Sequence, residues 1–84
     1  MMRYLIVAMR TPRFQQSVVE AHREYLAQLK EQGLLGLAGP FTDKTGGAYI
    51  VKAKDLESAK AIAFGDPIHT TGSSMLSVYE WDAA

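Results

Sequence analysis

The chain has 84 residues, of which 48% are hydrophobic, with nine basic and nine acidic side chains and no cysteine. The lack of cysteine excludes disulfides, thiol catalysis and thiolate metal sites, and the balanced, scattered charges lack the basic surface that nucleic-acid binding requires. We predict one domain over residues 1–84. Because a chain this short buries only about 60% of its unfolded surface, a partner subunit would stabilise it.

The opening segment, MMRYLIVAMR, contains a short apolar run of residues that favour strands. The run is far shorter than the ~20 residues of a membrane-spanning helix. The segment also lacks the small-residue cleavage site of a signal peptide. We therefore predict a strand at Tyr4–Met9, no membrane partner and a cytoplasmic location.

Apolar residues recur at helical spacing over Phe14–Gln32, which predicts one long amphipathic helix. Thr11-Pro12 separates this helix from the first strand, and Gly33 ends it with a left-handed residue. The apolar stripe consists of Phe14, Val18, Ala21, Tyr25, Leu26 and Leu29. At roughly 100° per residue, His22 falls in the middle of this stripe. An ionisable imidazole therefore lies on the face that packs inward.

A hairpin follows the helix. The segment Leu34–Phe41 predicts a strand, and its glycines and Pro40 place it at the edge of a sheet with a bulge or bend near Gly39-Pro40. The turn residues at Thr42–Gly47 then lead into a third strand at Ala48–Ala53.

The last third of the chain contains a second helix and a final strand. Asp55 caps the helix Leu56–Phe64, and Gly65 ends it. The Asp-Pro pair at 66–67 predicts an extended exit. A loop over Ile68–Ser73 and a strand over Met75–Trp81 complete the chain.

The element order β-α-β-β-α-β predicts an α+β, ferredoxin-like fold, with both helices on one face of an antiparallel four-stranded sheet. Both faces of the first strand are apolar: Tyr4, Ile6 and Ala8 point one way, and Leu5, Val7 and Met9 the other. A sheet with one face in water should alternate apolar and polar residues. We therefore predict a homodimer or larger homo-oligomer in which two sheets face each other.

The candidate chemical groups are few. His22 is either a packed core histidine or a general acid or base. Asp66 is either a turn former or the partner that orients this imidazole; it lies just past the second helix, where the helix dipole disfavours a carboxylate. Antiparallel helices on one sheet face bring the end of the second helix near the first half of the first. The sequence therefore suggests a His22–Asp66 pair but does not establish contact.

His69 is either an exposed loop residue or a second proton donor or substrate contact in the same pocket. The two histidines are far apart in sequence and lack metal-ligand spacing. We predict no metal and no cofactor. The glycine-containing segments lack the features of a phosphate loop, and no serine or threonine occupies a nucleophile elbow.

Four segments, taken in order, resemble the YCII-related domain family. They are YLIVAM, AHREYLAQLKEQG with a His-x-x-x-Leu pattern, LLGLAGPF with an Ala-Gly-Pro strand, and GDPIHTTG with an Asp-Pro turn. The resemblance implies a dimeric α+β barrel, a His–Asp dyad at His22 and Asp66, and a substrate site that includes Gly39 and Pro40. Family members usually carry an aromatic and a small apolar residue where this chain has Ile68-His69, which leaves the substrate open and adds His69 to the candidate site.

The family's clearest activity is dehydrochlorination of a chlorinated hydroxyhydroquinone, and related barrels include muconolactone-type isomerases. The resemblance thus implies a small lyase or isomerase acting without a cofactor on an acidic, aromatic small molecule. His22 would move the proton, and Asp66 would orient the imidazole and stabilise its charged form. The alternative is a non-catalytic ligand-binding or assembly module, in which Arg10, Arg13 or His69 holds an anion.

Overall fold

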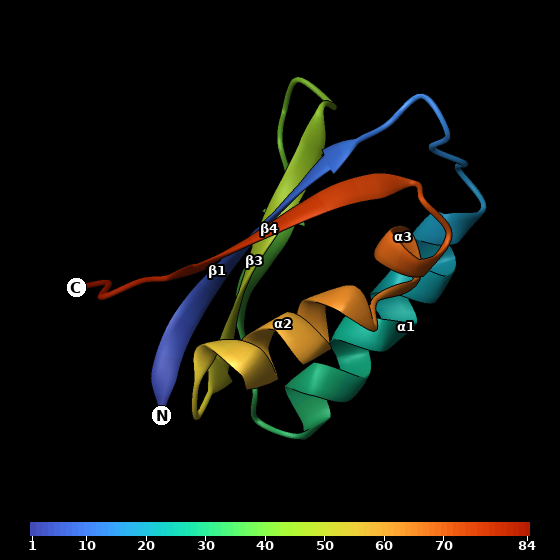
Figure 1. The fold of residues 1–84 in the computed structure, drawn as a ribbon. Coiled ribbons are helices and arrows are strands. Elements are labelled where there is room, and N and C mark those ends of the chain that lie inside the picture. Colours follow the sequence, from blue (N-terminus) through green and yellow to red (C-terminus); the bar gives the residue numbers. More distant parts are fainter.

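The computed structural model describes residues 1–84 and confirms the predicted β-α-β-β-α-β order, with one short helix added. Its strands form one sheet in the order β2-β3-β1-β4, with every neighbouring pair antiparallel. The elements are β1 (Met2–Arg10), α1 (Val18–Glu31), β2 (Leu35–Pro40), β3 (Gly46–Ala53), α2 (Leu56–Phe64), α3 (Pro67–Thr70) and β4 (Ser74–Glu80). All three helices cover the same face of the sheet (Figure 1).

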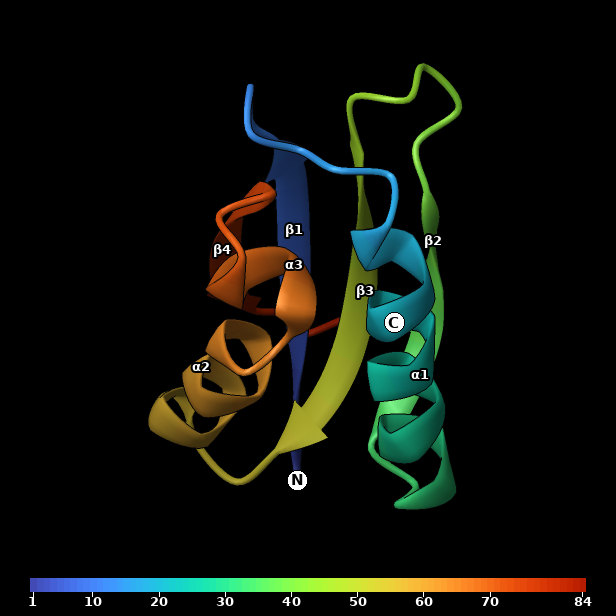
Figure 2. The same ribbon diagram turned by 90° about the vertical axis from the view of Figure 1, so that its right-hand side faces the viewer.

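The core lies between the helices and the inner face of the sheet. Alternate residues of the two central strands, among them Tyr4, Ile6 and Val51, are at most 1% exposed because successive side chains of a strand point to opposite faces. Figure 2 shows α1 in front of the β2–β3 half of the sheet, with α2 and α3 in front of the β1–β4 half. A seam between these two groups of helices runs along the middle of the sheet.

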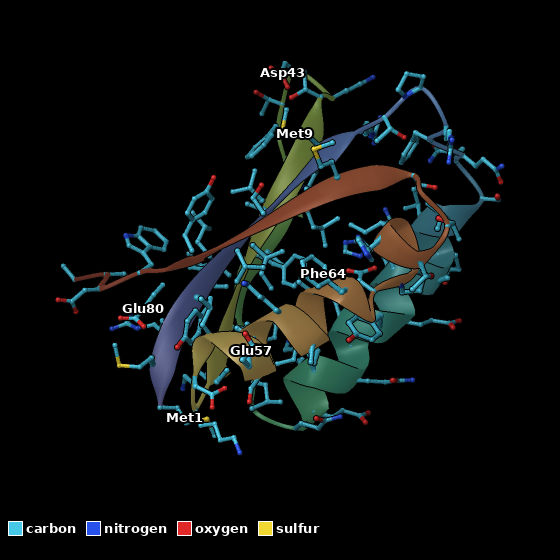
Figure 3. All side chains as sticks on the ribbon, in the orientation of Figure 1. Met1, Met9, Asp43, Glu57, Phe64 and Glu80 are labelled. Carbon is cyan, nitrogen blue, oxygen red and sulfur yellow. The ribbon has the colours of Figure 1, made fainter.

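No element covers the outer face. Leu5 pairs with Ile50 on one side and Tyr79 on the other, and Met9 pairs with Met75. In the single chain Tyr79 is 57% exposed and Met75 is 70% exposed. Figure 3 shows Met9 at the end of β1, away from α1 and α2. This exposed apolar face is the feature on which the predicted dimer depends, and the dimer itself stays a prediction.

The first helix begins four residues later than predicted. Phe14 and its neighbours form turns instead, in which the Phe14 amide donates to Thr11 O and the Val18 amide donates to Gln15 O. These turns let Phe14 pack against the core while its ring lies 4.0 Å from the guanidinium carbon of Arg10. The helix ends at Glu31, and Gly33 has the predicted positive φ, at 74°.

The segment predicted as a loop at Ile68–Ser73 begins as a helix. Pro67 occupies the first position of α3, where its fixed φ favours a helix and its missing N–H is not needed. Asp66 is the N-cap, with Oδ1 accepting from the Ile68 amide at 3.0 Å. Asp66 lies just past the end of α2, as predicted, but its carboxylate also sits at the favourable, N-terminal end of the next helix, which the sequence did not reveal.

The β2–β3 hairpin differs from the predicted one in the position of its irregularity. β2 is an edge strand as predicted, but its irregularity lies between Leu35 and Ala38, not at Gly39-Pro40, which stay in register with β3. Pro40 is tolerated there because an edge strand leaves one side of its backbone unpaired. The turn is tightened by Asp43, which accepts from the amide of Thr45 at 3.0 Å and from its hydroxyl at 2.7 Å; Figure 3 shows Asp43 at the hairpin tip.

At the start of β3, the backbone of Gly46 lies very close to the backbone of β1. A Cβ at Gly46 would lie 2.0 Å from Ala8 O, whereas a Cβ at Gly39 would have no neighbour within 4 Å. We expect Gly46→Ala to lower the free energy of unfolding by ~1–3 kcal/mol or more, because the clash is with backbone, and Gly39→Ala to change it little. Urea denaturation measures both. Equal midpoints for the two variants would contradict this account of the strand contact.

Candidate active site

The structure brings His22 and Asp66 into direct contact. His22 Nδ1 lies 2.7 Å from Asp66 Oδ2 and 3.0 Å from Oδ1. An ionised carboxylate only accepts hydrogen bonds, so this geometry assigns the proton to Nδ1 and leaves Nε2 as the nitrogen that can take up a second proton. Asp66 is fully buried, and the His22 side chain is 22% exposed.

Two further groups hold the carboxylate in place. The Ile68 amide donates to Oδ1 at 3.0 Å, and the Tyr49 hydroxyl donates to Oδ2 at 3.1 Å. Burial raises the pKa of Tyr49, and the negative charge of Asp66 raises it further, so Tyr49 remains a hydrogen-bond donor. Asp66 thus has donors from α1, β3 and its own helix α3.

A tyrosine on α1 fixes the chain just before Asp66. The Tyr25 hydroxyl donates to Ile62 O at 2.7 Å. A Cβ at Gly65 would lie 2.9 Å from that hydroxyl, so the absence of a side chain there allows the close approach. Burial, followed by the charge of Asp66, raises the pKa of Tyr25. This contact ties the end of α2 to the helix that carries His22.

A cavity of about 420 Å³ adjoins the pair. It lies over a row of the sheet without large side chains, in which Pro40 pairs with Gly47 and Gly47 pairs with Ala8. It is lined by Ala8, Arg10, Phe14, Gln16, Val19, His22, Arg23, Leu26, Ala38, Gly39, Pro40, Gly46, Gly47, Ala48, Tyr49, Ile68 and Ser74. Missing side-chain volume in the sheet therefore creates the cavity.

The predicted candidates divide around this cavity. His22, Gly39 and Pro40 line it. Asp66 is not part of the lining, and its buried carboxylate contacts His22. His69 is not part of the lining; its ring centroid lies 4.7 Å from that of Phe64. Sequence reasoning missed Tyr49 as a member of the site, since alternation alone identifies it as an inward-facing core residue. Its hydroxyl was the one available signal, because a buried tyrosine hydroxyl needs a partner.

The arrangement is suited to proton transfer. An imidazole held by a buried carboxylate can accept a proton at Nε2 and form an imidazolium that the carboxylate stabilises. No group of three or more His, Asp or Glu side chains is placed to hold a metal ion, and no helix is long and apolar enough to cross a membrane.

Fold and site together define a small α+β domain with a ferredoxin-like sheet and a His–Asp pair beside a cavity. The chain belongs to the YCII-related domain family, whose model matches residues 2–82. It is 45% identical over 78 residues to YjpA of Bacillus subtilis (strain 168), an uncharacterized protein, with 93% of this chain and 92% of YjpA aligned.

A solved structure has the same fold. It is 5-chloro-2-hydroxyhydroquinone dehydrochlorinase (TftG) from Burkholderia phenoliruptrix AC1100, in complex with 2,5-dihydroxybenzoquinone. It matches with a TM-score of 0.79 over 99% of this chain and 96% of the other, at 23% sequence identity. A likeness at this level of identity establishes the shared fold.

The protonated nitrogen of His22 can be checked directly. We expect NMR of nitrogen-15-labelled protein to find neutral His22 with its proton on Nδ1, because Asp66 accepts there. In Asp66→Asn the fixed acceptor is lost, and a mixture of tautomers should appear. His69, outside the cavity, is the internal control and should give the same spectrum in both proteins. An unchanged His22 tautomer in Asp66→Asn would contradict the orienting role of Asp66.

The raised pKa of Tyr49 predicts a loss of stability in alkali. An unfolded tyrosine ionises near pH 10.0, whereas folded Tyr49 keeps its proton to higher pH. The contribution of Tyr49 to the free energy of unfolding is therefore complete below about pH 10.0, where the unfolded tyrosine is still protonated. It is lost as the pH rises further, by up to ~1.4 kcal/mol per pH unit.

Replacing Tyr49 with Phe should make this alkaline loss shallower, and urea denaturation across a series of alkaline buffers measures the slope. Tyr79→Phe serves as the control because Tyr79 is 57% exposed. Equal slopes for wild type and Tyr49→Phe would contradict the prediction.

Proposed function

We propose that this protein is a small lyase or isomerase that acts without a cofactor on a small, ring-shaped substrate, with His22 transferring the proton. The observation that carries the proposal is the imidazole held at Nδ1 by buried Asp66 while His22 lines a cavity of about 420 Å³. That volume suits a molecule with a single ring. Orientation by a carboxylate and proton transfer by the imidazole together are typically worth ~10²–10⁴ in rate.

Dehydrochlorination of a chlorinated hydroxyhydroquinone is the finer form of the proposal. His22 Nε2 would take a proton from a ring hydroxyl, and a proton delivered to the chlorine-bearing carbon would give the keto form. Loss of a second hydroxyl proton would then break the carbon–chlorine bond and release chloride. The product is a hydroxyquinone, and because the net change is loss of HCl, no oxidant is needed. The charge that develops on the ring is spread over its oxygens, so a proton shuttle is sufficient.

Family membership and a shared fold support this choice of chemistry. The structural neighbour is named as a dehydrochlorinase and holds a dihydroxybenzoquinone. An isomerase that moves a proton between two positions of a ring would use the same nitrogen of His22 in both steps. The cavity and the dyad serve either reaction, and the substrate decides between them.

The protein's assembly is part of the proposal. A second copy would cover the outer face of the sheet, where Met9, Met75 and Tyr79 are exposed in the single chain. These side chains come from two neighbouring strands, in which Met9 pairs with Met75 and Leu5 pairs with Tyr79. Two such faces packed together would give the dimeric α+β barrel.

A ligand-binding module is the second candidate, and one observation favours it. Arg10 and Arg23 line the cavity without an acidic partner, since the chain's one salt bridge joins His22 to Asp66. A binding module would retain ligand without converting it. In an enzyme, Asp66→Asn should bind the substrate but fail to turn it over; in a binding module that variant has no turnover to lose.

The experiment is a turnover assay on a panel of hydroxyquinols, chlorinated hydroquinones and lactones, followed by absorbance and by chloride release. We expect His22→Ala to lower kcat at least ~10²-fold, because the proton acceptor is removed. Circular dichroism should show the fold retained. His69→Ala is the matched control, since its ring packs on Phe64, and should keep full activity.

Two results would overturn the proposal. Undiminished turnover in the His22→Ala variant would exclude His22 as the group that transfers the proton. Binding of panel members by wild type, seen by NMR, without any conversion would favour the binding module instead.

A further inference from the structure

We propose that the cavity takes a ring molecule bearing one carboxylate, and that Arg10 and Ser74 hold this carboxylate at the end remote from His22. The inference names the substrate class of the site described above and so rests on the proposed function. It starts from the charge of the lining. The whole chain has nine basic and nine acidic residues, yet the lining contains Arg10 and Arg23 and no Asp or Glu.

Arg10 is both oriented and uncompensated. It is the last residue of β1, and its guanidinium carbon lies 4.0 Å from the centroid of the Phe14 ring. Contact with an aromatic face restrains the guanidinium without neutralising its charge. No carboxylate lies within 4.0 Å of Arg10, because the chain's one ion pair is His22–Asp66. Its donors are therefore available to an anion in the cavity.

Ser74 supplies an independent observation. It pairs with Arg10 across β1 and β4, and it lines the cavity although the residue is only 6% exposed. Its hydroxyl takes part in none of the chain's side-chain hydrogen bonds. Every fully buried polar side-chain atom of the chain has a partner, so the Ser74 hydroxyl must keep access to the cavity. A ligand oxygen at this position would satisfy it.

The two ends of the cavity lie at different levels of the sheet. Tyr49, which contacts Asp66, pairs with Ile6, whereas Ser74 pairs with Arg10, four residues further along β1. That separation is about 13 Å along the strand. Ala8 lies between the two levels and leaves space for a flat ring.

A carboxylate fits this end better than a neutral group. The guanidinium presents parallel N–H donors that match the two oxygens of a carboxylate, and a hydroxyl can donate to one of them. Binding there would direct the opposite edge of the ring toward His22. The charged group would therefore set the position at which the proton is removed.

The test compares three probes that share a hydroquinone ring: 2,5-dihydroxybenzoate, 2,5-dihydroxybenzamide and hydroquinone itself. NMR titration of the labelled protein near neutral pH gives Kd for each, whether or not it is converted. We expect the carboxylate to bind at least ~10-fold more tightly than the amide, about 1.4 kcal/mol. High salt should weaken this preference.

Variants identify the residues that cause the preference for the carboxylate probe over the amide probe. Arg10→Met, which keeps the length and loses the charge, should abolish it, and Ser74→Ala should reduce it severalfold. Arg3→Met is the matched control because Arg3 lies on the same strand outside the cavity, where its guanidinium donates to Ala83 O at 3.0 Å. Spectra of the free variants establish that each is folded.

The outcomes separate this inference from the proposed function. Equal binding of 2,5-dihydroxybenzoate and 2,5-dihydroxybenzamide, or a preference that survives in Arg10→Met, would overturn the inference and leave the role of His22 intact. Conversely, a carboxylate preference that depends on Arg10, in a protein that converts no ring compound, would support the inference and refute the enzyme.

Discussion

The burial of one carboxylate is the constraint on which this structure depends. Asp66 is fully buried, and an ionised carboxylate in the interior is strongly unfavourable unless hydrogen bonds replace its water. The replacements come from His22 on α1, Tyr49 on β3 and the Ile68 amide of α3. Satisfying this one group therefore fixes how two helices sit on the sheet, and the same contacts select the tautomer of the imidazole.

The cavity follows from a second, simpler constraint, which is the size of the side chains in one row of the sheet. Pro40, Gly47 and Ala8 lie side by side across three strands. They leave the space below α1 unfilled, at the point where His22 faces the sheet. A cavity in a chain this small costs packing energy. It lies between the His22–Asp66 pair and an uncompensated arginine, and the proposed function would explain that cost.

Sequence patterns predicted the topology and the His22–Asp66 pair because both follow from local signals: helical spacing on α1, and glycine and proline at the end of α2. The patterns missed α3, since a four-residue helix has no periodicity and is fixed by Pro67 and the cap. Tyr49 and Ser74 were missed as polar members of the site for a different reason. Their partners are set by strand register and tertiary contacts, which no local pattern contains. The late start of α1 is likewise a tertiary effect, because Phe14 leaves the helix to pack beside Arg10.

The alternation along β1 gives its two surfaces separate roles. Ala8 and Arg10 face the cavity, while Val7 and Met9 belong to the uncovered outer face. Because side chains alternate strictly, inserting or deleting one residue within β1 would exchange the two surfaces beyond that point. The arginine would then lie on the apolar face and a methionine in the cavity. The identities of the residues in this strand can therefore vary, whereas a one-residue change of length within it would disturb the cavity lining and the apolar outer face together.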